Sequence, residues 1–318
     1  MLKKKINFIK KNNTMPSIIN QLFRRIKTKE SHEDLFSFIE TTVEELVNYP
    51  DGINDIYNRK IDGFLIKNAL SQNEVESLLG NFFRIFPEKK TVINEGLSMY
   101  PLPFSQVEQK NTGSRNAYKA YFEESLEFRR AFQKSLGFDF EKRVQSVLGK
   151  IANGRNIVAP PGFDNEGSYL SCNFRALYPA GNGTLKAHCG NYFHHEFPGF
   201  FKHLEEKSRV LNQLSYFTML QESEEGGELV IYDVEWEEAE IRLKGDTVLK
   251  TKKDKLLDLE NPRQVKRRKI KPGPGDMIVF AGGQIWHKVQ AVGGTKERIT
   301  LGGFLSLSND DKSVFTWT

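Results

Sequence analysis

Apolar residues in the first third of the chain recur at helical spacing. Along 31–47 they fall every three to four positions, which predicts an amphipathic helix. A short apolar run at 62–66 predicts a strand, and Ser71 with Glu74 forms a capping box, which predicts a helix reaching about position 86. The stripe of the first helix comprises Leu35, Phe38, Ile39, Val43 and Leu46.

Beyond these elements the pattern changes twice. Positions 87–118 are rich in Pro, Asn and Ser and predict a long loop, and apolar spacings near 122–135 and 139–151 predict two more helices. From Ser168 onward, short apolar runs are separated by Gly, Pro and Asn, which is typical of strands. The expected strands are 169–178, 214–221, 227–232, 276–280 and 298–307, and the charged stretch 236–271 has no pattern that predicts an element.

Helices followed by a run of strands predict one sheet system that helices buttress from outside. With 318 residues, 38% of them hydrophobic, the chain can bury one large core. We expect a basic leader at 1–30 and one domain at 31–318, with a helical part at 31–165 and a β core at 166–308. Nine Lys or Arg precede the first acidic residue, Glu30, without the apolar segment of a secretory signal. A solvated leader is expected, with a transit peptide or a surface-binding helix as alternatives.

Composition narrows the class of protein further. Two cysteines cannot form a disulfide framework, which favours a reducing, cytoplasmic setting, and no apolar run is long enough to span a membrane. A basic run lies within nine positions but lacks interleaved aromatic residues, which argues against nucleic-acid binding. A solvated sheet edge is expected there, with a docking patch for an acidic partner as the alternative. The run comprises Arg263, Lys266, Arg267, Arg268, Lys269 and Lys271.

Two histidines stand out by their surroundings. His188 follows a β segment and a Gly-rich turn, and His287 follows a tight turn, a buried strand and a bend. Both are expected at strand ends facing inward, where neutral imidazoles can bind a divalent metal. Arg298 lies eleven residues past His287, with Thr300 on the same face of its strand. A buried guanidinium beside a hydroxyl suits a dicarboxylate, because its planar fork pairs with one carboxylate through two hydrogen bonds.

These residues belong to a series of motifs in a fixed order. The series comprises Tyr178 and His188, Gly226-Gly227-Glu228-Leu229, Pro272 through Asp276 to Phe280, His287-Lys288-Val289, and Arg298-Ile299-Thr300. In order and spacing it resembles the iron(II)/2-oxoglutarate oxygenase superfamily, near its prolyl-4-hydroxylase-like branch. The strand from Asp62 and the helix after it resemble that family's entry, so the resemblance covers most of 62–307.

The resemblance implies a double-stranded β-helix (a jelly roll, cupin-like) as the core of an α+β, mainly β fold. It implies iron(II) held by His188 and His287, with O₂ as the oxidant. It also implies 2-oxoglutarate chelating the iron through its C1 carboxylate and 2-keto oxygen. The distal carboxylate would go to Arg298, assisted by Thr300. Tyr178 matches a family tyrosine near the cosubstrate, although a core aromatic residue is an equal alternative.

One position departs from the oxygenase pattern. Where those enzymes have His-x-Asp or His-x-Glu, this sequence reads His188-Cys189-Gly190, so the carboxylate of the two-His, one-carboxylate triad is missing. The substitution resembles the radical halogenases of the same superfamily, in which chloride or bromide takes that place. It implies a halogenase that chlorinates an unactivated aliphatic carbon by radical rebound. The histidines are 99 residues apart, which is nearer to the halogenases of freestanding small molecules.

Other readings of this position stay open. Glu196 or Asp233 could supply a distant carboxylate, but Glu196 lies eight residues from His188 in no strand-compatible register, and Asp233 caps the segment 226–233. Cys189 could ligate as a thiolate, but strand alternation turns it away from His188 and Gly190. The chain could also be a hydroxylase with water or another anion as third ligand, or a non-catalytic binding protein.

Substrate contacts are expected near the metal motif. A freestanding small molecule is the expected substrate, and an acyl chain on a carrier protein docked at the basic run is the alternative. Each candidate could equally orient the metal ligands through packing or hydrogen bonds. The candidates are Asn191, Tyr192, His194, His195, Trp286 and Arg175.

Overall fold

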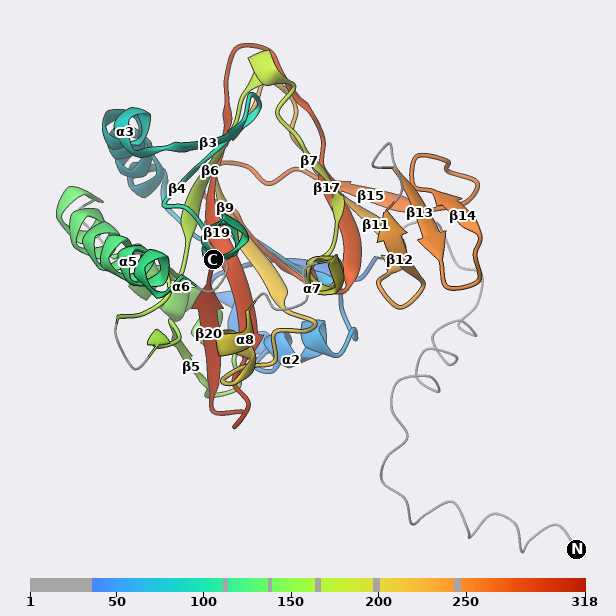
Figure 1. The fold of residues 1–318 in the computed structure, drawn as a ribbon, viewed down its shortest axis with the longest axis horizontal. Coiled ribbons are helices and arrows are strands. Elements are labelled where there is room, and N and C mark those ends of the chain that lie inside the picture. Colours follow the sequence, from blue (N-terminus) through green and yellow to red (C-terminus); the bar gives the residue numbers. More distant parts are fainter. Residues whose placement is uncertain (1–35, 111–113, 137–138, 164–166, 197–200, 243–246) are drawn as a thin grey trace, which may run out of the picture. The chain divides into compact units, whose positions relative to one another are not determined.

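Two facing β-sheets form the centre of the protein in the computed structural model, which describes residues 36–110, 114–136, 139–163, 167–196, 201–242 and 247–318 (Figure 1). The larger sheet runs in the order β1-β2-β16-β9-β19-β6-β4-β3, with β20 paired to β19 and β5 paired to β20. Its strands are β1 (Phe38–Thr42), β2 (Gly63–Lys67), β3 (Thr91–Asn94), β4 (Leu97–Tyr100), β5 (Asn156–Val158), β6 (Asn173–Leu177), β9 (Leu214–Gln221), β16 (Met277–Phe280), β19 (Arg298–Leu307) and β20 (Ser313–Trp317).

The second sheet has the order β15-β11-β17-β7, and a small sheet of order β12-β13-β14 lies beyond it. Strands β10 and β18 form a separate antiparallel pair. The bounds are β7 (Leu185–His188), β10 (Glu225–Gly226), β11 (Leu229–Glu235), β12 (Ala239–Arg242), β13 (Val248–Thr251), β14 (Leu256–Asp258), β15 (Arg267–Ile270), β17 (Ile285–Val289) and β18 (Val292–Gly293).

Helices cover the outside of the larger sheet, with α3 and α5 on the side of β4 and β6 (Figure 1). Their buried aromatic residues pack on β6, as the rings of Phe82 and Phe174 show at 5.1 Å. The helices are η1 (Glu45–Asn48), α2 (Gly52–Tyr57), α3 (Gln72–Lys89), α4 (Phe104–Lys110), α5 (Arg115–Leu136), α6 (Phe140–Gly149), η3 (Pro179–Gly181), α7 (Gly190–Glu196) and α8 (Lys202–Glu205). The architecture confirms the expected jelly roll with helical buttresses.

Several local predictions are confirmed. Helix α3 begins after Ser71, whose side chain accepts from the Glu74 backbone while Glu74 reaches back, so the capping box is formed. Strands β9 and β19 occupy the predicted ranges. Helices α5 and α6 cover the two predicted helices, although α5 already begins at Arg115. In each case the local pattern and the tertiary environment favour the same element.

Two local predictions are wrong. From Phe36 on, the segment expected as a helix at 31–47 contains β1 and η1, and β1 pairs in parallel with β2 along its whole length. The first residues of that segment and the expected leader at 1–30 lie outside the described residues. Sheet pairing supplies β1 with long-range hydrogen bonds, which outweigh a weak helical periodicity in a segment with β-branched Thr41 and Thr42. The stretch expected as a loop at 87–118 instead holds β3, β4 and α4, and α5 already begins at Arg115. The pairing of β4 with β6 explains this order, because it extends the sheet.

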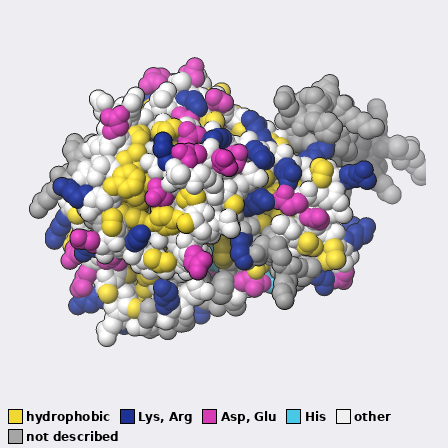
Figure 2. Space-filling view, turned by 90° about the horizontal axis from the view of Figure 1, so that it is seen from above, with side chains coloured by type: hydrophobic (Ala, Val, Ile, Leu, Met, Phe, Trp, Pro, Cys, Tyr) yellow, Lys and Arg dark blue, Asp and Glu magenta, His cyan; other side chains and the backbone are white. Residues whose placement is uncertain are grey.

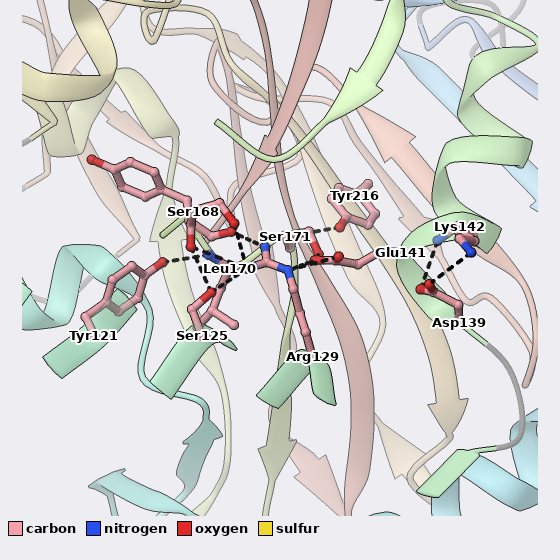
Figure 3. Close-up of polar contacts among 11 residues, drawn as sticks. Tyr121, Ser125, Arg129, Asp139, Glu141, Lys142, Ser168, Leu170, Ser171 and Tyr216 are labelled. Atoms are coloured by element: carbon pink, nitrogen blue, oxygen red, sulfur yellow. Dashed lines mark hydrogen bonds and ion pairs between the residues drawn. The ribbon is translucent and has the colours of Figure 1, made fainter. Parts of the chain in front are cut away.

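Arg129 on α5 joins the helices to the chain entering β6 (Figure 3). Its Nε donates to both carboxylate oxygens of Glu141 on α6, at 2.8 and 2.9 Å. The guanidinium also donates to Ser125, to Ser168 and to the Tyr169 carbonyl, and Glu141 accepts from Ser171. Because both charged groups are largely buried and fully hydrogen-bonded, the network fixes where β6 starts.

The basic run lies on β15 and the turn before it, at an edge of the second sheet. Acidic side chains neutralise part of it: Arg267 pairs with Glu260, and Lys271 lies 3.9 Å from Glu222. On the face drawn in Figure 2, Lys and Arg side chains alternate with Asp and Glu. This placement supports the expected charged sheet edge. Among the described helices, none is long and apolar enough to cross a membrane.

Candidate active site

The two predicted metal ligands face each other on neighbouring strands. His188 ends β7 and His287 lies in β17, and the two residues are directly opposite in the antiparallel register. Opposite residues in such a pair project to the same face of the sheet, and the two imidazole centroids are 4.3 Å apart. Residues 99 positions apart in sequence are therefore brought together by one strand pair.

Backbone carbonyls orient both imidazoles. The Nδ1 of His188 lies 2.6 Å from the Lys186 carbonyl oxygen, and the Nδ1 of His287 lies 2.8 Å from the Ile285 carbonyl oxygen. Since a carbonyl oxygen can only accept, Nδ1 carries the proton in each ring and Nε2 keeps its lone pair. Burial, followed by the neighbouring charge of His188, lowers the pKa of His287 well below its usual range. The lone pair of His287 is thus available for a metal at neutral pH.

Arg298 faces these histidines from the larger sheet. It is opposite Leu177 in register, and Leu177 packs against Val289 of the histidine-bearing sheet. Its Nε and Nη2 are buried and, within the described residues, have no hydrogen-bond partner. Burial, followed by the charge of Arg175, lowers the Arg298 pKa to about 10, so the group stays charged at neutral pH. A buried guanidinium with unsatisfied donors favours an anionic ligand, and a carboxylate matches its fork.

Three neighbouring residues form the surroundings of the Arg298 side chain. Thr300 is two positions further on β19 and projects from the same face of the sheet. The ring of Phe217 on β9 lies 5.2 Å from the guanidinium carbon. A Cβ on Gly227, whose φ is +74°, would be 3.0 Å from the Arg298 Cδ. The Gly226-Gly227 motif therefore lets the backbone approach the stem of this arginine.

Gly190 begins helix α7, two residues after the first histidine. It is buried, and its φ lies outside the left-handed region, so its backbone conformation does not require glycine. A Cβ at this position would lie 2.7 Å from the Gln213 Nε2 and 3.0 Å from the Gly283 Cα. The Gln213 Oε1 is buried and has no hydrogen-bond partner among the described residues. The absence of a side chain at Gly190 therefore lets the Gln213 amide and the Gly283 backbone approach closely, and this amide has an unsatisfied oxygen.

Within the described part of the chain, no group of three or more His, Cys, Asp or Glu side chains could hold a metal. Glu196 lies 3.7 Å from His195, and Asp233 is exposed on β11 beside the backbone of Lys266. Cys189 is fully buried in a second apolar cluster, and burial raises its thiol pKa to about 12. A thiolate is therefore disfavoured at neutral pH, and none of the three completes the pair of histidines.

Three other candidates have packing or polar contacts within the fold. The Tyr178 hydroxyl is 3.4 Å from the Lys90 Nζ and its ring packs on the main core, so its role at a cosubstrate stays a prediction. Trp286 is fully buried, and Tyr192 packs against it at 5.3 Å. This placement favours packing over substrate contact for both residues.

The remaining residues of α7 have partners within the fold. Asn191 exchanges hydrogen bonds with Asn212, at 2.7 and 2.8 Å, and so holds the loop that carries Gln213. His194 has its Nδ1 3.4 Å from Glu205 on α8, and His195 is half exposed. Asn191 and His194 therefore position α7, and a direct substrate contact by them stays a prediction.

Sequence reasoning missed three residues of the site. Phe193 is 38% exposed, and its ring lies 5.6 Å from that of His188. Phe280 on β16 meets His287 edge-on at 4.9 Å, and Gln213 borders Gly190. Phe280 ends the motif that starts at Pro272, which is a usable signal. Phe193 and Gln213 have no local signal, because only the packing of α7 brings them to the histidines.

The jelly roll, the facing imidazoles and the buried arginine define an oxidoreductase of the iron(II)- and 2-oxoglutarate-dependent oxygenase class. A sequence model of the family described as carrier-protein-independent halogenase WelO5 matches residues 35–318. The chain belongs to this family, which confirms the expected superfamily. No curated protein matches the chain significantly.

Solved structures give the same fold. An N-substituted L-amino acid dioxygenase from Burkholderia ambifaria AMMD is 17% identical and has a TM-score of 0.51, covering 83% of this chain and 90% of that one. Its complex with alpha-KG gives the same values.

Proposed function

We propose that this protein is a halogenase that uses iron(II), 2-oxoglutarate and O₂ to place chlorine or bromine on an unactivated aliphatic carbon. The observation that carries the proposal is Gly190, which lacks a side chain where the oxygenases have a metal-binding carboxylate. Its φ lies outside the left-handed region, so backbone conformation does not explain the glycine, and the close packing of Gln213 and Gly283 is the alternative to a halide site. Membership of the carrier-protein-independent halogenase family supports this reading and favours a freestanding small molecule as the substrate.

The residues of the site fit these groups. His188 and His287 would hold the iron through Nε2, and Arg298 with Thr300 would bind the distal carboxylate of 2-oxoglutarate. Gly190 would leave the third protein position to a halide, whose single negative charge replaces that of the missing carboxylate. When bound, iron with its cosubstrate and O₂ supplies the oxidising power to activate a C–H bond, and the adjacent halide can then be transferred to carbon.

A halide titration tests the proposal. In the anaerobic iron(II) complex, we expect chloride or bromide to tighten 2-oxoglutarate binding by at least about fivefold, because ligands that share one metal are coupled. The measurement follows the visible charge-transfer band during 2-oxoglutarate titration at constant ionic strength. Sulfate and perchlorate provide the control, since they screen charge equally but ligate iron poorly. Equal responses to all four salts would remove the support for halide ligation and favour a hydroxylase with water in the gap.

The cosubstrate anchor gives a second expected result. Replacing Arg298 by Ala should weaken 2-oxoglutarate binding by about 2–5 kcal/mol, because a buried carboxylate loses its charged partner. Thr300→Val should cost only about 1 kcal/mol, as expected for one neutral hydrogen bond. Both values come from the same band titration, with thermal unfolding as the check on folding. Unchanged affinity in Arg298→Ala would assign the anchor to another residue.

A further inference from the structure

A second arginine, Arg175, projects into the same site and has no role in the proposed reaction so far. It lies on β6 directly opposite Thr300 of β19, so it projects from the same face of the larger sheet as Thr300 and Arg298. In the same strand pair Arg298 is opposite Leu177, so Arg175 lies two positions along β6 from the residue that faces the cosubstrate anchor.

Arg175 lacks a counterion in the described part of the chain. Its Nε donates to the Asn173 side-chain oxygen at 3.2 Å, and no ion pair joins its guanidinium to a described carboxylate. Burial lowers its pKa to about 10, with no carboxylate raising it again. A guanidinium removed from water without an anionic partner is costly, so a ligand that supplies the anion would bind strongly there.

The charges of the two arginines and of the proposed ligands do not balance, and one positive charge remains. Iron(II) brings two positive charges, and Arg298 and Arg175 bring one each. The 2-oxoglutarate dianion and one halide bring three negative charges in total. Arg298 is committed to the distal carboxylate, so the remaining positive charge belongs with Arg175. One further monoanion would balance the site.

The surroundings of Arg175 are apolar. Its guanidinium carbon lies 5.7 Å from the ring centroid of Phe304, and Phe217 lines the same face beneath Arg298. Both rings are half-buried, and the half-exposed Phe193 lies beside His188. The aromatic rings near the guanidinium and near His188 therefore suit contact with a hydrocarbon group, while the arginine suits a planar oxyanion.

We propose that the substrate is an amphipathic carboxylic acid whose carboxylate pairs with Arg175 while its aliphatic part lies over the histidine pair. The inference rests on the proposed function for what happens to that carbon, but the binding of the acid can be tested without turnover. Arg175 would then be a specificity-determining residue, because a neutral analogue would leave it buried and unpaired.

The test is a calorimetric titration of the anaerobic iron(II)–2-oxoglutarate complex with three acids and their primary amides. The probes are octanoate, 3-phenylpropionate and indole-3-acetate, which share a carboxylate and differ in the apolar part. We expect at least one acid to bind about 30-fold or more tightly than its amide, since the amide leaves a charged partner unpaired. Arg175→Gln should remove that preference and leave amide and 2-oxoglutarate binding unchanged.

Two variants serve as controls. Arg84→Gln removes an exposed arginine on α3 and should leave every affinity unchanged. Arg175→Met replaces the cation by an apolar side chain of similar length. Without ligand, we expect this variant to be at least as stable as the native protein, since no ion pair with a described residue is lost. It repeats the binding test if the Gln variant unfolds.

The outcomes distinguish a failure of the Arg175 inference from a failure of the halogenase proposal. Equal binding of acids and amides throughout the panel, or an acid preference that survives in Arg175→Gln, would overturn the inference. A loss of 2-oxoglutarate affinity in Arg175→Gln without an acid preference in the native protein would assign Arg175 to the cosubstrate and also overturn it. Failure of the halide titration would refute the halogenase proposal and leave acid binding by Arg175 unaffected.

Discussion

His287→Ala is expected to abolish the visible charge-transfer band that iron(II) and 2-oxoglutarate give in the absence of oxygen. The two facing imidazoles are the proposed ligands, and the described residues contain no group of three or more His, Cys, Asp or Glu that could hold the metal instead. Losing residues that merely support a ligand costs about 10- to 100-fold in metal affinity, so losing a ligand itself should cost more. The measurement is an anaerobic iron titration followed by absorbance, and His188→Ala should behave alike.

A matched histidine variant makes this result specific. His195→Ala removes a half-exposed imidazole seven residues beyond His188 and should keep the band. Thermal unfolding of each variant separates loss of the site from loss of the fold. A native-like band in either ligand variant would show that iron binds elsewhere, whereas loss of the band in all three variants would point to a general effect of the substitutions on folding.

Gly190→Asp is expected to remove the halide response and to convert any remaining turnover from halogenation to hydroxylation. A carboxylate at this position would restore the third protein ligand and occupy the place of the halide. The structure shows an obstacle to the simple variant, because the new Cβ would lie 2.7 Å from the end of Gln213. The double variant Gly190→Asp with Gln213→Ala removes that clash and is the sharper test.

The controls distinguish the carboxylate from its Cβ. Gly190→Ala with Gln213→Ala adds the Cβ alone and should keep the halide response, although the Cβ stays tight against Gly283. Gln213→Ala by itself should also keep it. The readouts are product mass and the halide dependence of 2-oxoglutarate binding. If the Asp and Ala double variants lost the halide response equally, the carboxylate would have no special effect and Gly190 would serve packing.

The residues proposed for the centre could all be predicted from local sequence. His188, His287, Arg298 and Gly190 were recognisable because the identity of a ligand residue and its position on a strand are local properties. Strands β9 and β19 were also predicted at their observed bounds, since a buried strand shows as an apolar run between turn residues. Local pattern thus sufficed wherever the local preference and the fold agreed.

The features that depend on partners distant in sequence became visible only in the folded structure. Strand β1 forms because β2 lies beside it, and β4 forms because it extends the sheet at β6, so neither was evident from its own pattern. Gln213 borders Gly190 only through the packing of the loop after α8. Arg175 gains its importance from its place opposite Thr300 and from having no counterion among the described residues. Such properties belong to pairs of distant residues, and the free energy of burying a charge depends on neighbours that the chain supplies only when folded.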